Sequence, residues 1–198
     1  MKKKVINKKN SVRFLSSDNL KKKKEESLVK EQKNKSLKLS IKEGVGASIM
    51  TGTGNSFITP FALALGSSSL QIGVLSSFSS LIGPISQLSS RHLMEKMTRK
   101  KIVILTVLLQ ALMWLPIILL GGMYYFGFWI EYMPILLIIF YSMHVGFGAI
   151  AYPSWFSWMG DLVPEKKRGK YFSKRNRITG LTVIIAMLVA GFTLDYFE

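Results

Sequence analysis

Five long apolar segments dominate the sequence after residue 40. An α-helix rises about 1.5 Å per residue, so each is long enough to cross a hydrocarbon core of roughly 30 Å. Segments two to five hold no charged residue except Asp195. Their length and their lack of strict alternation favour helices over a β-barrel. The sequence therefore predicts an all-α membrane protein with five transmembrane helices, from about Ile41 to Leu65, Ser69 to Ser90, Ile102 to Met123, Met133 to Met159 and Ile178 to Phe197.

The basic residues lie between these segments in an asymmetric pattern. Residues 91–101 and 160–177, the second and fourth connections, are rich in Lys and Arg. Residues 66–68 carry no charge, and residues 124–132 carry only Glu131. With the amino-terminal tail inside, all 27 Lys and Arg fall on one side, as the positive-inside rule expects. We therefore expect a multi-pass protein of the cell membrane, with its amino terminus in the cytoplasm and the end of this chain outside.

Residues 1–40 form a basic tail that differs from the apolar body, residues 41–198. Residues 1–42 hold 15 of the 27 basic residues and 4 of the 11 acidic ones. This composition buries too little apolar surface to fold alone, so we expect a disordered, solvated tail, with a short helix around residues 20–38 as an alternative for that part. An alternative is a tail held on anionic lipids, where each Lys gains roughly 1 kcal/mol. Nucleic acid is not an expected partner, because aromatic residues that stack on bases are not interleaved with the lysines.

The sequence offers no basis for a cofactor or a metal site. Cysteine is absent, and the two histidines, His92 and His144, are far apart. No predicted span carries a metal-ligand cluster, a paired carboxylate or a nucleophile beside a base, so an enzyme is not expected.

The second connection carries a motif that resembles one in the major facilitator superfamily. The family places the pattern G-x-L-x-D-R-x-G-R-R between its second and third helices. Arg91 and Thr98 stand where the family has glycines, and the first departure affects the close helix packing that a glycine allows. The positions that fit are Leu93, Glu95 in place of Asp, Lys96 in place of Arg, Arg99 and Lys100.

A second motif, at Gly160–Gly169, resembles the family element D-x-x-P-x-x-x-R-G through Asp161, Pro164 and Arg168. The resemblance covers about residues 41–198. It implies a fold of two six-helix halves with a substrate path between them. This chain would supply helices one to five only, so we expect it to be an amino-terminal fragment or truncated product that lacks helix six and the second half.

The resemblance also implies an ion pair between Asp161 and either Arg99 or Lys100. Such a pair would tie two cytoplasmic hairpins together in one conformation and break in another. The alternative is a solvated Asp161 that pairs with nothing. The charged residues expected to form this gate latch are Glu95, Lys96, Arg99, Lys100, Asp161 and Arg168.

Polar residues in the first and fourth segments are candidates for substrate contact. Ser48, Thr51, Asn55 and Thr59 are spaced along one helical face, and Tyr141, His144, Gly148 and Tyr152 lie near one face of the fourth segment. The family places helices one and four along its central cavity. This favours the cavity, while hydrogen bonding between helices is the alternative. The candidate cavity residues are Thr51, Asn55, Thr59, Tyr141, His144 and Tyr152.

His144 is also a candidate for proton handling, since imidazole titrates near neutral pH. A neutral histidine bonded to a neighbouring helix is the alternative. Gly146–Ala149 resembles the glycine part of the family's helix-four motif R-x-x-Q-G-x-G-A, but Ser142 holds the arginine position. That arginine is linked to proton coupling in drug exporters, so such coupling is not expected here.

The leading functional hypothesis is secondary-active transport of a small solute by alternating access. The expected partners are a small-molecule substrate and the lipid bilayer. The alternative is a non-transporting membrane scaffold that presents the basic tail at the cytoplasmic surface. Deletion of residues 1–40 separates the two, because it would abolish the scaffold's activity and only modestly affect a transporter.

Overall fold

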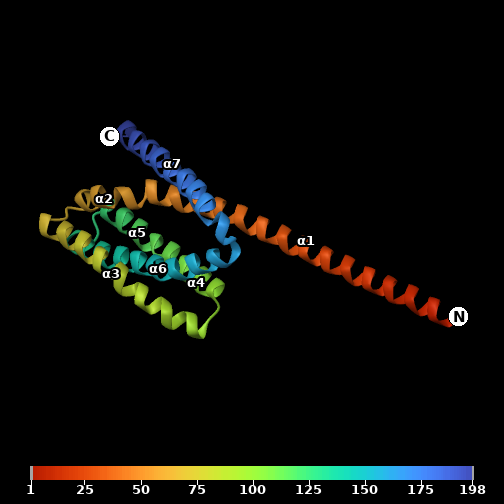
Figure 1. The fold of residues 1–198 in the computed structure, drawn as a ribbon. Coiled ribbons are helices and arrows are strands. Elements are labelled where there is room, and N and C mark those ends of the chain that lie inside the picture. Colours follow the sequence, from red (N-terminus) through yellow and green to blue (C-terminus); the bar gives the residue numbers. More distant parts are fainter. Residues whose placement is uncertain (1, 198) are drawn as a thin grey trace. The chain divides into compact units, whose positions relative to one another are not determined.

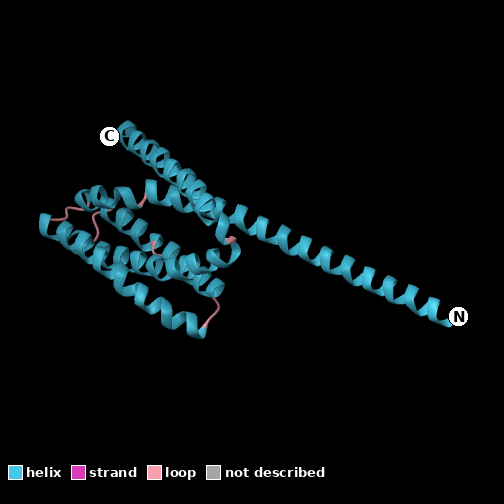
Figure 2. Cartoon of the chain, viewed as in Figure 1, coloured by secondary structure: helices cyan, strands magenta, loops and turns pink. Residues whose placement is uncertain are grey.

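The computed structural model describes the backbone of residues 2–197 and the side chains of residues 23–25, 27–129 and 131–197. Every regular element in this range is helical, and Figure 2 shows helices joined by short loops. The expected all-α architecture is therefore confirmed. The elements are α1 (Lys2–Thr53), η1 (Asn55–Phe57), α2 (Ile58–Ala64), α3 (Ser69–Lys96), α4 (Arg99–Leu112), α5 (Trp114–Tyr125), η2 (Ile130–Tyr132), α6 (Met133–Leu162) and α7 (Glu165–Phe197).

The basic tail is helical. The chain divides into two compact units, Met1–Gly44 and Val45–Glu198, and α1 extends from the first into the second. The helix differs from the disordered tail expected over residues 1–40. Residues 1–43 contain neither Gly nor Pro, and Lys and Glu lose little rotamer freedom in a helix. Glu31 and Lys35 also form an i,i+4 ion pair of 2.9 Å. Because the described side chains up to Lys35 are exposed, local propensity accounts for this helix.

Three helical stretches among the described residues are long and apolar enough to cross a membrane. They are Arg99–Tyr125, which comprises α4 and α5, Met133–Leu162, which is α6, and Glu165–Phe197, which is α7. They include the third, fourth and fifth predicted spans. The first two predicted spans are not among them, so the count of five stays a prediction.

Helix α3 begins at Ser69, where the second predicted span begins, and it has two different faces. Ser68 caps it: Gln71 N–H donates to Ser68 Oγ at 3.3 Å, and Ser68 N–H donates to Gln71 Oε1 at 2.8 Å. Gly83 and Ser90 are buried on the inner face. These small and polar residues lower the average apolarity of α3. The opposite face carries exposed apolar residues every three or four positions, namely Leu70, Val74, Phe78, Leu81, Ile85 and Leu88.

The inner face of α3 packs against α6, and the two helices run side by side in the same direction (Figure 1). The hydroxyls of Ser90 and Ser154 lie 3.2 Å apart and are fully buried. A Cβ added at Gly146 would lie 3.1 Å from Ser86 Oγ. Small residues at these positions let the two backbones approach closely.

The first predicted span is not one continuous helix. Helix α1 ends at Thr53, and η1 and α2 follow it as separate elements. A Cβ at Gly52 would lie 2.6 Å from the main-chain oxygen of Val183 in α7, and a Cβ at Gly54 would collide with the Trp114 ring. These two neighbours approach so closely that only glycine fits. The expected face of Ser48, Thr51, Asn55 and Thr59 is consequently divided among three elements.

An apolar core lies at the end of the bundle away from the basic loops, where α2, α3, α5 and α6 meet. It fixes the start of α6 against the middle of α5, because Met133 and Leu137 are completely buried there. The cluster consists of Ile58, Ala62, Leu65, Leu75, Ile117, Leu120, Met133 and Leu137.

Candidate functional site

A hydrogen bond joins α6 to the end of α4, close to the break between α4 and α5. Helix α4 ends at Leu112, and Pro116 lacks the N–H that would continue the ladder to Leu112. Near this break His144 Nδ1 lies 3.0 Å from the main-chain oxygen of Gln110. A carbonyl oxygen only accepts hydrogen bonds, so Nδ1 carries the proton and the ring donates. The histidine thereby ties α6 to the end of α4.

The Gln110 side chain contacts the other ring nitrogen. Its Nε2 lies 3.4 Å from His144 Nε2, which is an acceptor when Nδ1 holds the proton. The amide lies over Gly148, where an added Cβ would come within 2.5 Å of Gln110 Nε2 and 2.9 Å of Cδ. The absence of a side chain at Gly148 therefore makes room for the amide beside the imidazole.

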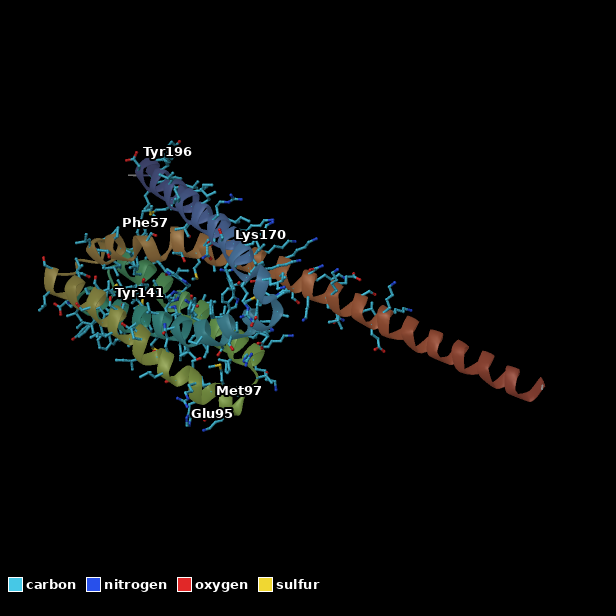
Figure 3. The ribbon with its side chains drawn as sticks, in the orientation of Figure 1. Phe57, Glu95, Met97, Tyr141, Lys170 and Tyr196 are labelled. Carbon is cyan, nitrogen blue, oxygen red and sulfur yellow. The ribbon has the colours of Figure 1, made fainter. Side chains whose placement is uncertain are left out.

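Two aromatic rings complete the surroundings of His144, which is 1% exposed. Trp114 meets the imidazole edge-on, with ring centroids 5.1 Å apart, and Tyr141 stacks on it at 5.8 Å. Figure 3 shows Tyr141 within the helical bundle. We call Asn55, Gln110, Trp114, Tyr141 and His144 the central polar cluster.

Three buried polar atoms near these helices have no hydrogen-bond partner among the described residues: Asn55 Oδ1, Trp114 Nε1 and Ser142 Oγ. The Trp114 ring covers Gly54, the neighbour of Asn55. An unsatisfied donor and an unsatisfied acceptor thus lie in adjacent parts of the cluster. Leaving such a group unpaired costs about 1–3 kcal/mol, so a hydrogen bond from a polar ligand or water to either atom is favoured.

The predicted cavity residues are divided by the structure. Tyr141 and His144 come together, and Asn55 lies beside the Gly54 contact with Trp114. Thr51 Oγ1 donates to Ala47 O of its own helix at 3.0 Å, and Thr59 is half-buried in α2. Tyr152 is 59% exposed and stacks on Trp155 and Phe156, so it belongs to a different aromatic group.

Charged side chains meet at the end of the bundle where α4 begins and α6 ends. Arg99 forms an ion pair with Asp161 through Nη1 and Oδ2. The two residues are 62 positions apart, so the pair links the α3–α4 turn to the α6–α7 turn. Its side chains are 43% and 69% exposed, which leaves the contact open to water.

Arg168 caps the end of α6. Its Nη2 donates to Gly160 O at 2.7 Å and its Nε donates to Val163 O at 3.3 Å. A guanidinium at these free carbonyls satisfies acceptors at the negative end of the helix dipole. Arg168 Nη1 also lies 3.8 Å from Glu165, and no contact with Asp161 is recorded among the described residues.

The remaining predicted latch residues do not join the Arg99–Asp161 pair. Glu95 lies 4.0 Å from Arg91 and 3.9 Å from His92, both on its own helix. Within the described residues, Lys96 and Lys100 form no ion pair. Figure 3 labels Glu95 at the end of α3 and Lys170 near the start of α7.

Sequence reasoning missed four residues with defined contacts. Gln110 and Trp114 surround His144, and Arg175 lies over the Trp155 ring at 4.4 Å from its centroid. Gln110 is the only amide side chain between Ile102 and Met123, and this was the available signal. A cation–π pair between α6 and α7 has no comparable signal, because it depends on how the helices turn toward each other.

Helices that are long and apolar enough to cross a membrane are typical of a membrane protein. The family model of the Major Facilitator Superfamily matches residues 44–198, so the chain belongs to this family. The chain is a membrane transporter of the major facilitator type. Members of the family bind small-molecule substrates within the membrane and are transporters rather than enzymes. Comparisons with curated proteins and with solved structures give no significant match.

Proposed function

We propose that this chain moves a small solute across the cell membrane by alternating access, with the Arg99–Asp161 pair as a latch that favours one conformation. The observation that supports this proposal is the pair itself, which joins two turns distant in sequence. A contact of this kind holds the hairpins together while it exists and frees them when it breaks.

The exposure of the pair suits a reversible latch. Exposed ion pairs contribute about 0–1 kcal/mol, because water competes for both charges. That energy is too small to be a main source of stability. It is sufficient to shift two conformations of similar free energy by up to about five-fold. Arg168 keeps its bonds to α6 carbonyls, so in this proposal it holds the turn in shape while the pair opens.

The central polar cluster is the proposed binding site for the solute. Asn55 Oδ1 accepts hydrogen bonds and Trp114 Nε1 donates them, and neither has a partner among the described residues. A solute with a donor and an acceptor would satisfy both atoms. His144 keeps its bond to Gln110, so we assign it the role of positioning the break between α4 and α5.

The membrane topology that we propose has five spans, with the basic loops and the amino terminus in the cytoplasm and the end of this chain outside. Helix α3 supports this count, because it is 28 residues long and carries a stripe of exposed apolar residues from Leu70 to Leu88. The buried small residues Gly83 and Ser90 contact α6, and lipid would meet the apolar stripe. The scaffold hypothesis has no comparable support.

Cysteine labelling tests the latch directly, because the chain contains no cysteine. We would place a reporter at Ser142→Cys and measure its labelling rate by a membrane-impermeant maleimide from the cytoplasmic side. Arg99→Asp or Asp161→Arg should change the rate about five-fold, and the double exchange Arg99→Asp/Asp161→Arg should restore it. Arg91→Asp is the matched control, because the ion pair of Arg91 among the described residues is with Glu95 of its own helix.

Two results would contradict the proposal. Equal labelling rates in all variants would mean that the pair biases no conformational equilibrium. Once a substrate is known, Asp161→Asn should reduce solute uptake and leave membrane insertion unchanged, and unchanged uptake would contradict the latch. A basic tail whose deletion abolishes every measurable activity would support the scaffold instead.

A further inference from the structure

A pocket of about 510 Å³ lies at the connection between α5 and α6. It is at the end of the bundle away from the Arg99–Asp161 pair, and it shares no residue with the central polar cluster. The described residues that line it are Trp129, Glu131, Tyr132 and Leu136. The volume falls within the range of roughly 300–1,000 Å³ that small-molecule sites occupy.

The wall of the pocket is a tightly folded turn. Phe128 N–H donates to Met123 O at 2.9 Å, and Tyr132 N–H donates to Trp129 O at 3.1 Å. Trp129 has φ = 53°, the only positive φ of a non-glycine residue in the described part of the chain. This conformation costs about 1–3 kcal/mol for such a residue, and strain of this kind is concentrated at ligand sites. Leu136 packs against the apolar core and gives the pocket a fixed floor.

The lining is mainly apolar, and Glu131 is the one charged residue among its described members. Glu131 is the only charged residue between Lys101 and Asp161, and no described Lys or Arg pairs with its carboxylate. Trp129 and Tyr132 are 68% and 60% exposed, so their rings are open to a ligand. Aromatic faces attract cations through their quadrupole, and Trp is the most effective. The carboxylate repels anions and supplies the counter-charge.

We propose that this pocket binds an alkylated ammonium ion, with Trp129 and Tyr132 against its methyl groups and Glu131 as its counter-ion. The same chemistry is present in a free quaternary ammonium solute and in the head group of phosphatidylcholine. The proposal rests on the pocket alone and does not depend on the latch.

Choline is the probe, and the protein is held in uncharged maltoside micelles at constant ionic strength. We expect calorimetry to show saturable binding of choline and much weaker binding of 3,3-dimethylbutan-1-ol, its neutral isostere. Glu131→Gln and Trp129→Leu should each weaken binding about two- to five-fold or more, as expected for an exposed cation–π or charge contact. Trp129→Phe should retain part of the affinity.

Tyr125→Leu is the matched control, because Tyr125 is an exposed aromatic residue at the end of α5 outside the pocket lining. The Tyr125→Leu variant should bind choline with the same affinity as the unchanged chain. Glu131 is itself exposed, so Glu131→Gln should keep the helical circular dichroism and report on binding alone.

A second experiment distinguishes a free quaternary ammonium solute from the head group of phosphatidylcholine. In nanodiscs of phosphatidylglycerol, choline should bind as it does in micelles. A loss of choline binding when half of the lipid is phosphatidylcholine would assign the site to the lipid head group, and retained binding would assign it to a free solute. Equal affinity for choline and its neutral isostere, or unchanged affinity in Glu131→Gln, would overturn the proposal.

Discussion

His144 in α6 donates a hydrogen bond through Nδ1 to the main-chain oxygen of Gln110 in α4, at 3.0 Å. The acceptor lies close to the break between α4, which ends at Leu112, and α5, which begins at Trp114. The imidazole also lies beside the Gln110 amide and between two aromatic rings. A single residue of α6 therefore holds both the backbone and the side chain at this break.

Loss of the His144 ring should destabilise the bundle. His144→Leu removes the donor to Gln110 O, and interhelical hydrogen bonds in membrane proteins contribute roughly 0.6 kcal/mol on average and up to about 1.7. His144→Asn carries an amide N–H near the Nδ1 position and should recover part of the loss. Thermal unfolding in micelles measures the difference. Equal midpoints for Leu and Asn would show that the hydrogen bond contributes nothing.

A side chain at Gly148 should displace the Gln110 amide. Gly148→Ala places a Cβ within 2.5 Å of Gln110 Nε2, so the amide must move away from His144. We expect an unfolding midpoint roughly 2–4 °C lower, which corresponds to about 1 kcal/mol for a chain of this size. Gly122→Ala in α5 is the control, since a Cβ there meets nothing within 4 Å. Similar shifts in the two variants would contradict the contact.

The contact between α1 and α7 should depend on Gly52. A Cβ at this position would lie 2.6 Å from Val183 O and 2.7 Å from Ala186 Cβ, and a main-chain oxygen cannot move aside cheaply. Gly52→Ala should therefore separate the two helices and lower cross-linking between cysteines introduced on them. Gly46→Ala, in open space on the same helix, should leave cross-linking unchanged.

The buried serine pair between α3 and α6 should show measurable coupling. Ser90 and Ser154 are completely buried and their hydroxyls are 3.2 Å apart. A double-mutant cycle with Ser90→Ala and Ser154→Ala should give a coupling of roughly 0.6 kcal/mol in unfolding free energy. Additive effects of the two substitutions would mean that the hydroxyls do not bond to each other.

The sequence predicts the order of the helices, because a chain that crosses a membrane must form its backbone hydrogen bonds within itself. A long apolar segment is therefore expected to be a helix. Residues 102–123, 133–159 and 178–197 all lie within helical stretches long enough to span, as hydropathy predicts, and the first of these is divided between α4 and α5. Low burial does not by itself predict the full length of α1 over the basic tail, because helix formation there depends on local propensity. Gly52, Gly54 and Pro60 indicate from the sequence that the first segment can bend, but the close contacts of Gly52 with α7 and of Gly54 with Trp114 appear only in the tertiary structure.

The candidate site was predictable only in part. His144 stood out as an imidazole in an apolar segment, and Asp161 and Arg99 stood out through their motifs. The sequence could not name Gln110 as the partner of His144, because the two are 34 residues apart and meet only when α4 packs on α6. Tyr152 shares a helical spacing with His144, but it is exposed and stacks on other rings.

The sequence by itself determined the family, the all-helical class and the placement of three helices long and apolar enough to span a membrane, because these depend on local composition and on motifs within one loop. Only the tertiary structure decided which polar atoms are paired, how closely the helices approach and which charges meet. Those outcomes depend on distances between segments far apart in the chain. Side-chain volumes at the helix contacts set these distances, down to single glycines such as Gly148.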